Sequence, residues 1–229
     1  MQFHVITLFP HALQSYIDTS LIKRAREKKI ITVNFVNPRD YTKDSHHKVD
    51  DTPYGGGPGM VMQAEPIYHA VNFVKSKIYA RTKKKLKVRT ILFSTRGTIF
   101  NQSTARRLSK YDHLIFICGR YEGVDERVAQ HIADEEISLG DFVLAGGELP
   151  AMVCIEAVAR HVKGVLGTEE SLEEKKGSYP TYTKPDILIF KKNRTKKILK
   201  VPEVLLLGDH KKIAAWRLTY GTRGGLQKS

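Results

Sequence analysis

Cysteine is scarce in this chain: Cys118 and Cys154 are the only two among 229 residues. Each lies within an apolar run, which favours two buried thiols in a reducing compartment over a disulfide or a metal site. No window approaches the roughly 18 to 20 apolar residues of a membrane-spanning helix. The N-terminal stretch MQFHVITLFP lacks the basic start and the cleavage site of a signal peptide, and is typical of a strand. The protein is therefore predicted to be cytoplasmic, with no membrane partner.

Acidic residues are comparatively few. The chain has 24 Asp and Glu against 38 Lys and Arg, which gives a formal net charge of +14 and a pI near 9.7. This excess favours a polyanionic partner, because neutralised phosphates release counterions. A basic ribosomal accessory protein has a similar balance, so the charge indicates the class of partner and not a chemistry. Hydrophobic residues make up 41% of the chain, which is enough for a sizeable core.

Two common nucleotide-binding patterns are missing. The loop SLGDFVLAGGELPAM (138–152) lacks the dinucleotide pattern GxGxxG, which argues against NAD. The glycine-rich stretch PYGGGPGM (53–60) has no GK[ST] ending and follows no predicted strand, which argues against a Walker phosphate loop. The nearby SHHKVDD segment (45–51) carries potential metal ligands, but adjacent histidines rarely chelate one ion. No metal ligand is predicted.

Apolar runs of strand type alternate along the chain with segments of helical periodicity. Strands are predicted over residues 3–8, 30–36, 88–93 and 113–118, and helices after Pro10, from Glu65, and near 102–110, 125–133 and 149–162. This alternation predicts an α/β fold with a parallel sheet flanked by helices. Such sheets bind ligands at the C-terminal ends of their strands, so the loops 94–97 and 119–123 are candidate binding loops.

The composition changes after the first domain, which is predicted over residues 1–162. Residues 163–179 are charged and poor in large apolar side chains, and are interpreted as an interdomain linker. Residues 180–229 are predicted to form a small, basic, mostly helical second domain, in which Asp209 caps a helix that Gly221 ends.

The segment 138–152 combines three glycines with apolar residues, and contains no Lys, His or Cys. Glycines without cations suit a flat, apolar ligand held through backbone amides, such as an adenine base between walls formed by Leu139, Phe142 and Leu144. The glycines of GRYEGVDER (119–127) would let the backbone approach a ligand, while its acidic residues also suit the first turn of a helix. An adenosine-containing cofactor is the interpretation that these loops favour.

Several stretches, in order along nearly the whole chain, together resemble the bacterial tRNA (guanine-N(1)-)-methyltransferases of the SPOUT superfamily. They are Thr7–Pro10, NPRDYT (37–42), VDDTPYGGGPGM (49–60), GRYEGVDER, SLGDFVLAGGELPAM, GVLGTEES, YPTYTKP, VPEVLLLGDH and WRL (216–218). The resemblance implies a trefoil knot in the C-terminal part of the first domain and S-adenosylmethionine as the cofactor. It also implies a homodimer, and tRNA as the substrate, methylated on the guanosine immediately 3′ to the anticodon. Mg²⁺ is implied as a possible aid to activity.

The resemblance also implies site residues. Those expected to bind the cofactor are Leu92, Ser94, Gly119, Tyr121, Glu122, Gly123, Ser138, Leu139, Gly140, Asp141, Phe142, Val143, Leu144, Gly146 and Gly147. The polar, glycine-rich segment 37–63 is too long for a connector and is interpreted as a functional loop that closes over the substrate. Asp50, Tyr54 and Gly59 of this segment are expected to bind substrate.

Methylation of guanine at N1 requires a general base and a cation. N1 of guanine is a poor nucleophile until a carboxylate removes its proton, and a guanidinium is the natural stabiliser of the charge that then grows on O6. Arg160 matches the family's catalytic arginine. In the linker, Lys175 lies opposite the family's aspartate, so Glu173 or Glu174 is expected to act as the base. The alternative for both glutamates is a solvated linker helix.

The sequence departs from the family pattern elsewhere. Leu92 replaces a tyrosine and Thr95 a proline near the expected cofactor site, and the second domain is shorter than usual. Two alternatives therefore stay open: a knotted methyltransferase acting on another RNA, such as ribosomal RNA, or a non-catalytic RNA-binding protein of the same fold. Arg160 and the glycines of the cofactor loop argue against the second alternative, because a protein that only binds RNA needs no such pocket.

Overall fold

The computed structural model describes residues 1–80, 85–166, 179–192 and 195–221. The chain divides into two compact units, Met1–Gly167 and Thr168–Ser229. This division falls within the range 163–179 that the sequence predicts as a linker, although residues 167–178 lie outside the described residues. The two units are described separately.

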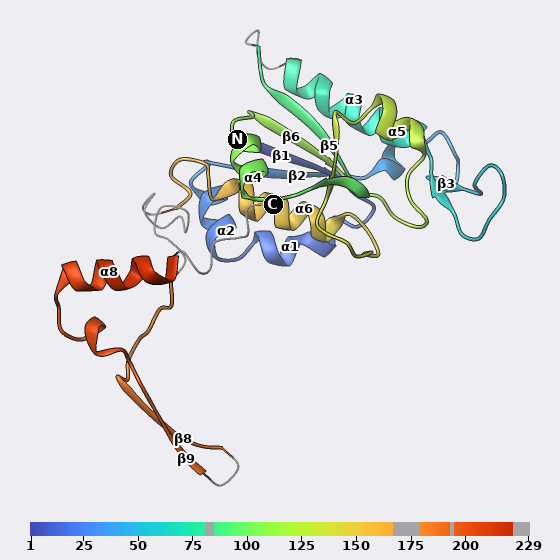
Figure 1. Ribbon diagram of the computed structural model, residues 1–229. Coiled ribbons are helices and arrows are strands. Elements are labelled where there is room, and N and C mark those ends of the chain that lie inside the picture. Colours follow the sequence, from blue (N-terminus) through green and yellow to red (C-terminus); the bar gives the residue numbers. More distant parts are fainter. Residues whose placement is uncertain (81–84, 167–178, 193–194, 222–229) are drawn as a thin grey trace. The chain divides into compact units, whose positions relative to one another are not determined.

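The first unit is built on a five-stranded sheet in the order β2-β1-β6-β5-β7, with every neighbouring pair parallel (Figure 1). Its strands are β1 (Gln2–Ile6), β2 (Thr32–Val36), β5 (Val88–Ile99), β6 (His113–Ile117) and β7 (Glu135–Ser138). The prediction of an α/β fold with a parallel sheet is confirmed. Because all the strands point the same way, their C-terminal ends meet at one edge.

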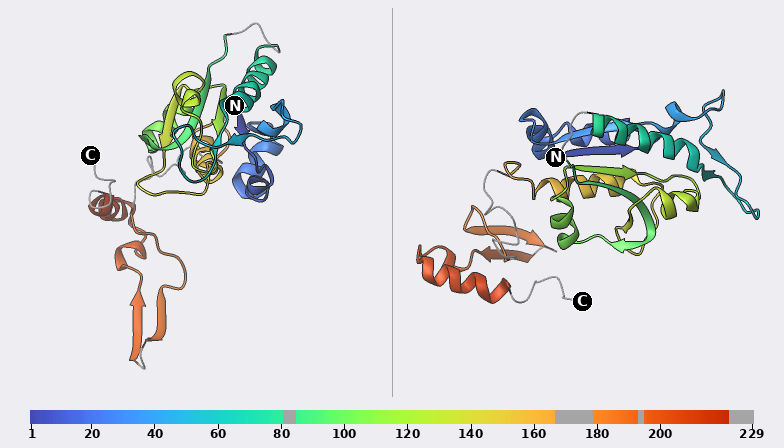
Figure 2. Two further views of the ribbon diagram at one scale, coloured as in Figure 1. Left: turned by 90° about the vertical axis from the view of Figure 1, so that its right-hand side faces the viewer. Right: turned by 90° about the horizontal axis from the view of Figure 1, so that it is seen from above.

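Helices cover both faces of this sheet, as Figures 1 and 2 show from several sides. The helices α1 (His11–Ile17), α2 (Ser20–Glu27), α4 (Gln102–Leu108) and α6 (Glu148–Ala159) pack on one face, and α3 (Ala64–Ala80) and α5 (Glu126–His131) on the other. Among the described residues, none of the helices combines the length and the apolar character that crossing a membrane requires.

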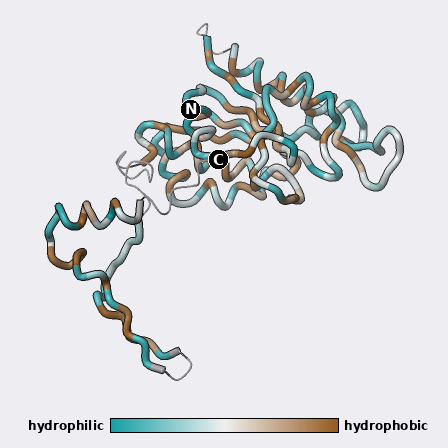
Figure 3. The backbone as a smooth tube through the Cα atoms, in the orientation of Figure 1, coloured by the Kyte–Doolittle hydropathy of each residue, from teal (hydrophilic) through white to brown (hydrophobic). Residues whose placement is uncertain are grey.

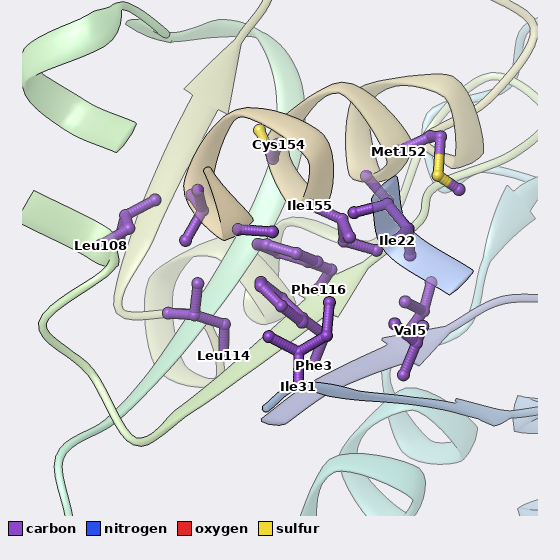
Figure 4. Packing of buried hydrophobic residues seen from close by; sticks show 14 of the residues in the cluster. Phe3, Val5, Ile22, Ile31, Leu108, Leu114, Phe116, Met152, Cys154 and Ile155 are labelled. Atoms are coloured by element: carbon purple, nitrogen blue, oxygen red, sulfur yellow. The ribbon is translucent and has the colours of Figure 1, made fainter. Parts of the chain in front are cut away.

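Alternation along the strands supplies two cores. In β6, Phe116 points into the core on the side of α6, and its neighbours Ile115 and Ile117 into the core beneath α3. Figure 4 shows Phe116 next to Phe3, and their ring centroids are 6.1 Å apart. Apolar residues accordingly run along the central strands, as the colouring in Figure 3 shows. A strand buried on both faces is typically a near-continuous apolar run, and Leu114–Ile117 of β6 form such a run.

Three local predictions need correction. The run expected as one helix after Pro10 is two helices, separated at Asp18–Thr19. Residues 94–97 are not a loop, because β5 continues to Ile99, with a register shift against β7 between Phe93 and Thr98. The segment 37–63 is not purely a loop: it contains the 3-10 helix η1 (Pro38–Tyr41) and the antiparallel strands β3 (Asp50–Asp51) and β4 (Val61–Met62).

Strand β7 was missed because its sequence begins with two acidic residues. Glu135 accepts hydrogen bonds from Arg89 (2.9 Å) and Arg107 (2.7 Å), and Glu136 accepts one from Arg96 (3.2 Å). These arginines come from other elements, so the sequence around β7 does not reveal that its charges are neutralised. Partnered carboxylates are tolerated at a partly buried strand where unpartnered ones are not.

The second unit contains a β-hairpin of β8 (Ile187–Lys192) and β9 (Thr195–Lys200), then η3 (Glu203–Leu205) and α8 (His210–Gly221). The predicted cap is confirmed, because Asp209 Oδ1 accepts from the backbone N–H groups of Lys211 (3.0 Å) and Lys212 (3.1 Å). The prediction of a mostly helical domain overlooked the hairpin. In β8 an unbroken run of apolar residues hides the period of two by which strands are recognised.

Candidate functional site

A pocket of about 380 Å³ lies at the C-terminal edge of the sheet. Three stretches supply most of its wall: residues Leu92–Arg96 of β5, the loop after β6, and the loop between β7 and α6. Its lining consists of residues 92–96, 119–124, 136–139 and 142–147, with Glu126, Ala129 and Pro150. The parallel sheet brings these distant segments together, as the strand order requires.

Most of the residues expected to bind a cofactor line this pocket. They are Leu92, Ser94, Gly119, Tyr121, Glu122, Gly123, Ser138, Leu139, Phe142, Val143, Leu144, Gly146 and Gly147. The structure does not place Gly140 and Asp141 in the lining. Gly140 instead closes a turn, because its N–H donates to Ser138 Oγ (3.2 Å) and its φ of +154° lies in a region that side chains disfavour.

The apolar walls of the pocket are only partly buried in the single chain. Val143 is 85% exposed, and Phe142, Leu144 and Tyr121 are exposed as well. Tyr121 also has a φ of +59°, an uncommon conformation for a residue with a side chain. Large apolar side chains at the mouth of a pocket are typical of a surface that a ligand or a second molecule covers.

A buried carboxylate, Glu148, is paired with a residue of the pocket wall, and no sequence pattern predicted this pair. Glu148, at the start of α6, is 3% exposed. Its Oε1 accepts a hydrogen bond of 2.6 Å from the Thr7 hydroxyl, and its Oε2 lies 2.9 Å from Arg120 Nη2. An acidic residue in the first turn of a helix usually complements the helix dipole, so nothing local indicated a buried ion pair.

The two adjacent glycines of the loop have a structural reason of their own. A Cβ on Gly146 would lie 2.6 Å from Arg120 Cδ and 2.7 Å from Glu148 Oε2. A Cβ on Gly147 would lie 2.6 Å from Cys118 Cα, and the Gly147 N–H donates to the Gly119 carbonyl oxygen at 3.0 Å. Close packing therefore demands glycine at both positions, whether or not a ligand binds beside them.

Two acidic residues that line the pocket, Glu126 and Glu136, are paired with the same arginine. Arg96 contacts both Glu136, at 3.2 Å, and Glu126. The hydrogen bonds that Arg96 donates, to Glu126 first and to Glu136 second, raise the pKa of its guanidinium. Among the described residues, no group of three or more His, Cys, Asp or Glu side chains could hold a metal ion, and this includes the region of His46 and His47.

The last residue of the glycine-rich segment 53–60 contacts a loop that lines the pocket. The N–H of Glu122 donates to the Met60 carbonyl oxygen (3.0 Å), and the N–H of Met62 to that of Gly123 (3.0 Å). Of the residues expected to bind substrate, Asp50 lies in β3 and Tyr54 is fully exposed. Neither of them, nor Gly59, lines the pocket of the single chain.

Comparison with known proteins decides the family. The model of a family described as tRNA (Guanine-1)-methyltransferase TrmD matches residues 1–228. The chain belongs to this family. The prediction made from the sequence motifs is thereby confirmed.

Relatives in this family share long stretches with the chain. A protein of Carboxydothermus hydrogenoformans named tRNA (guanine-N(1)-)-methyltransferase is 51% identical over 95% of this chain and 81% of its own length. Proteins with the same name from Moorella thermoacetica and Campylobacter jejuni are 48% and 44% identical. They match 95% and 96% of this chain, and 84% and 91% of their own lengths.

Of the residues expected to carry the family's catalysis, Arg160 is described by the structure, and it does not line the pocket. Arg160 follows the last turn of α6, partly exposed, with Nη1 4.0 Å from Glu156 Oε1. Glu173 and Glu174 lie outside the described residues, as does Lys175. The predicted roles of these residues therefore remain predictions.

Proposed function

We propose that this protein transfers a methyl group from S-adenosylmethionine to N1 of the guanosine immediately 3′ to the anticodon of tRNA. The observation that carries the proposal is the pocket at the C-terminal edge of the sheet, lined by the glycine-rich loops, in a chain of the tRNA (guanine-1)-methyltransferase family.

The residues present fit S-adenosylmethionine. The volume of about 380 Å³ falls within the range of small-molecule sites. Leu139, Phe142 and Leu144 provide apolar surface for an adenine, and the backbone of the loop 119–123 provides hydrogen-bonding groups beside it. When bound, the cofactor supplies an electrophilic methyl group. The chain's part is to hold the target base in line with that group, since positioning supplies much of the rate in such a transfer.

We assign the acid–base work to residues near the end of α6 and in the linker. Glu173 or Glu174 removes the N1 proton, and Arg160 stabilises the negative charge that develops on O6. Arg160 is partly exposed and lies outside the pocket wall, so it is accessible to the guanine of a tRNA that binds from solution. The described residues offer no cluster of three ligands for Mg²⁺, and we assign no step to that ion.

The variants Glu173→Gln and Glu174→Gln identify the base. The variant that lacks the general base is expected to show a kcat at least about a hundredfold lower, which is in the range of general-base contributions. The other variant is expected to keep its kcat. Unchanged rates in both variants would exclude both residues and direct the search to Asp50 and Glu122.

The proposed fold and assembly follow the family. We propose that the chain between β7 and α6 forms the trefoil knot of the SPOUT superfamily. We also propose a homodimer that completes the site, because exposed apolar side chains gather near the pocket. Leu149 and Val153, one turn apart on α6, are 64% and 46% exposed, and Val143 lies on the loop that leads into α6.

The second unit is proposed to bind tRNA together with the first. Its hairpin carries exposed Lys191, Lys196, Lys197 and Lys200, and the whole chain has a net charge of +14. Contacts to phosphate of this kind make affinity strongly dependent on salt.

The deciding experiment uses labelled S-adenosylmethionine and two tRNA transcripts that differ only in having guanosine or adenosine immediately 3′ to the anticodon. Label on the guanosine transcript alone supports the proposal. No label on either transcript, with the cofactor bound, would mean that another RNA is the substrate. If the protein binds RNA but no cofactor, it is a non-catalytic binding protein.

A further inference from the structure

Glu148 links two structural elements through its two carboxylate oxygens. Oε1 accepts from the Thr7 hydroxyl, just beyond the end of β1, and the Thr7 oxygen in turn accepts from the N–H of Phe9 at 2.9 Å. Oε2 lies 2.9 Å from Arg120 Nη2, in the loop after β6. Glu148 itself begins α6, so a single carboxylate ties the ends of two strands to the start of this helix.

Arg120 carries this arrangement into the wall of the pocket. Its Nη1 donates a hydrogen bond of 3.3 Å to the carbonyl oxygen of Ala145, and both residues line the pocket. Its guanidinium carbon lies 4.5 Å from the centre of the Phe9 ring, within cation–π range. Arg120 therefore helps to hold the turn at residues 145–147, together with the hydrogen bond from the Gly147 N–H to the Gly119 carbonyl oxygen.

The partly buried guanidinium of Arg120 depends on Glu148 for charge compensation. Arg120 Nε is buried and has no hydrogen-bond partner among the described residues. The pair with Glu148 Oε2 is close but poorly aligned for a hydrogen bond, so the attraction is mainly between charges. Without the carboxylate, this partly buried cation would lose its charged partner, and the long arginine side chain would turn toward water in the pocket.

We propose that Glu148 is a positioning residue for the cofactor. Through Arg120 it holds the Ala145 carbonyl and the turn that follows it in the shape that receives S-adenosylmethionine. The proposal rests on the proposed function, because it assumes that this pocket binds that cofactor. Glu148 has no direct contact with the reacting atoms in this scheme.

The test is the variant Glu148→Gln, which keeps the size of the side chain and removes its charge. The dissociation constant for S-adenosylmethionine, measured by calorimetry at a temperature where circular dichroism shows the folded state, is expected to rise at least about tenfold. The kcat at saturating substrates is expected to stay within about threefold, and the KM for tRNA within about twofold. A cofactor affinity equal to that of the wild type would overturn the proposal. An equal rise in the dissociation constant for S-adenosylmethionine and in the KM for tRNA would also overturn it.

Glu135→Gln is the matched control. Glu135 is also a mostly buried glutamate paired with two arginines, Arg89 and Arg107, but it does not line the pocket. Its amidation is expected to lower thermal stability and to leave cofactor affinity unchanged. A weakening of cofactor binding in Glu135→Gln as large as in Glu148→Gln would show a general loss of structure and overturn the positioning role.

A second variant covers the case in which Glu148→Gln does not fold. Thr7→Val keeps the charge of the carboxylate but removes the hydrogen bond that it accepts from Thr7, together with the one that the Thr7 oxygen accepts from the Phe9 N–H. It is expected to weaken cofactor binding about threefold. An unchanged affinity in Thr7→Val would then overturn the proposal. If the wild-type protein binds no S-adenosylmethionine, the proposed function itself fails, which is a different result from a wild type that binds and a variant that binds equally well.

Discussion

Gly59 lies against Glu122: a Cβ at Gly59 would be 2.6 Å from Glu122 Oε1 and 2.8 Å from its Cδ. Gly59 belongs to the glycine-rich segment and Glu122 to the wall of the pocket, so this contact couples the two. From the sequence, Gly59 is expected to bind substrate and Glu122 to bind the cofactor. In the structure, a side chain at Gly59 and the present position of Glu122 exclude each other.

Substitution of Gly59 tests this coupling against a matched control. Gly59 and Gly56 both have a φ of +81°, but a Cβ on Gly56 would meet nothing within 4 Å. Alanine strains the backbone similarly at both positions, by about 1 kcal/mol. Only Gly59→Ala displaces Glu122, so only this variant is expected to show cofactor affinity weakened by at least about threefold, as for one lost hydrogen bond. Calorimetry decides, and equal affinities in the two variants would contradict the coupling.

Removal of the Arg160 guanidinium should affect turnover and not cofactor binding. Arg160→Ala is expected to lower kcat by about a hundredfold or more, because it removes stabilisation of charge that exists only in the transition state. The affinity for S-adenosylmethionine should stay within about twofold, since Arg160 lies outside the pocket wall. Lys163→Ala, which removes a nearby exposed cation, is the control and should turn over normally at saturating tRNA. Wild-type turnover in Arg160→Ala would show that the assigned role is wrong.

The proposed dimer predicts a monomeric variant. Leu149→Glu places a charge on the exposed apolar side of α6 and is expected to convert a dimer into a monomer in sedimentation velocity, because a buried unpaired charge is costly. Tyr79→Glu makes the same change at an exposed residue of α3, on the other face of the sheet, and should leave the dimer intact. A wild-type protein that sediments as a monomer at micromolar concentration would refute the dimer.

The thiols of Cys118 and Cys154 are expected to be unreactive in the native protein. Burial, together with the neighbouring charge of Glu148, raises the pKa of Cys118 well above its ordinary range, and burial alone raises that of Cys154. Since the thiolate is the reactive form, neither cysteine is expected to react with a disulfide reagent at pH 8 within minutes, and both should react in denaturant. Rapid reaction of either thiol under native conditions would reveal opening of the core around α6.

Lowering the pH is expected to remove the contribution of the ionised Glu135 carboxylate to the free energy of unfolding. Burial would raise the pKa of Glu135, but Arg107 and Arg89 together hold it below its ordinary value of 4.5. A carboxylate with a lowered pKa contributes stability that is complete above pH 4.5 and is lost as the pH falls through the folded-state pKa. Urea unfolding of Glu135→Gln is therefore expected to depend less on pH below 4.5 than unfolding of the wild type. Identical slopes for the two proteins would show that Glu135 is not stabilised by its arginines.

Some features could be predicted because their signals are local. The apolar run of His113–Ile117 predicts a buried strand wherever it is placed, and Asp209 caps α8 through N–H groups only two and three residues away. The order of the motifs was enough to predict the family, which the comparisons confirm. A parallel sheet then implies that the loops after its strands meet, as those around the pocket do.

Other features depend on contacts that no local pattern records. Glu135 and Glu136 look like part of a polar loop until the arginines of β5 and α4 are brought beside them. Glu148 looks like an ordinary helix-start residue until Thr7 and Arg120 surround it. The cost of burying a charge is set by its partners, and these partners come from distant parts of the chain.

The sequence by itself therefore determined the family, the parallel α/β plan and the loops that surround the pocket. Only the tertiary structure decided why Gly146 and Gly147 must be glycines and how Glu148 reaches the pocket through Arg120. The physical reason is that periodicity and capping act over a few residues, while close packing and charge compensation join atoms that only the folded chain brings together.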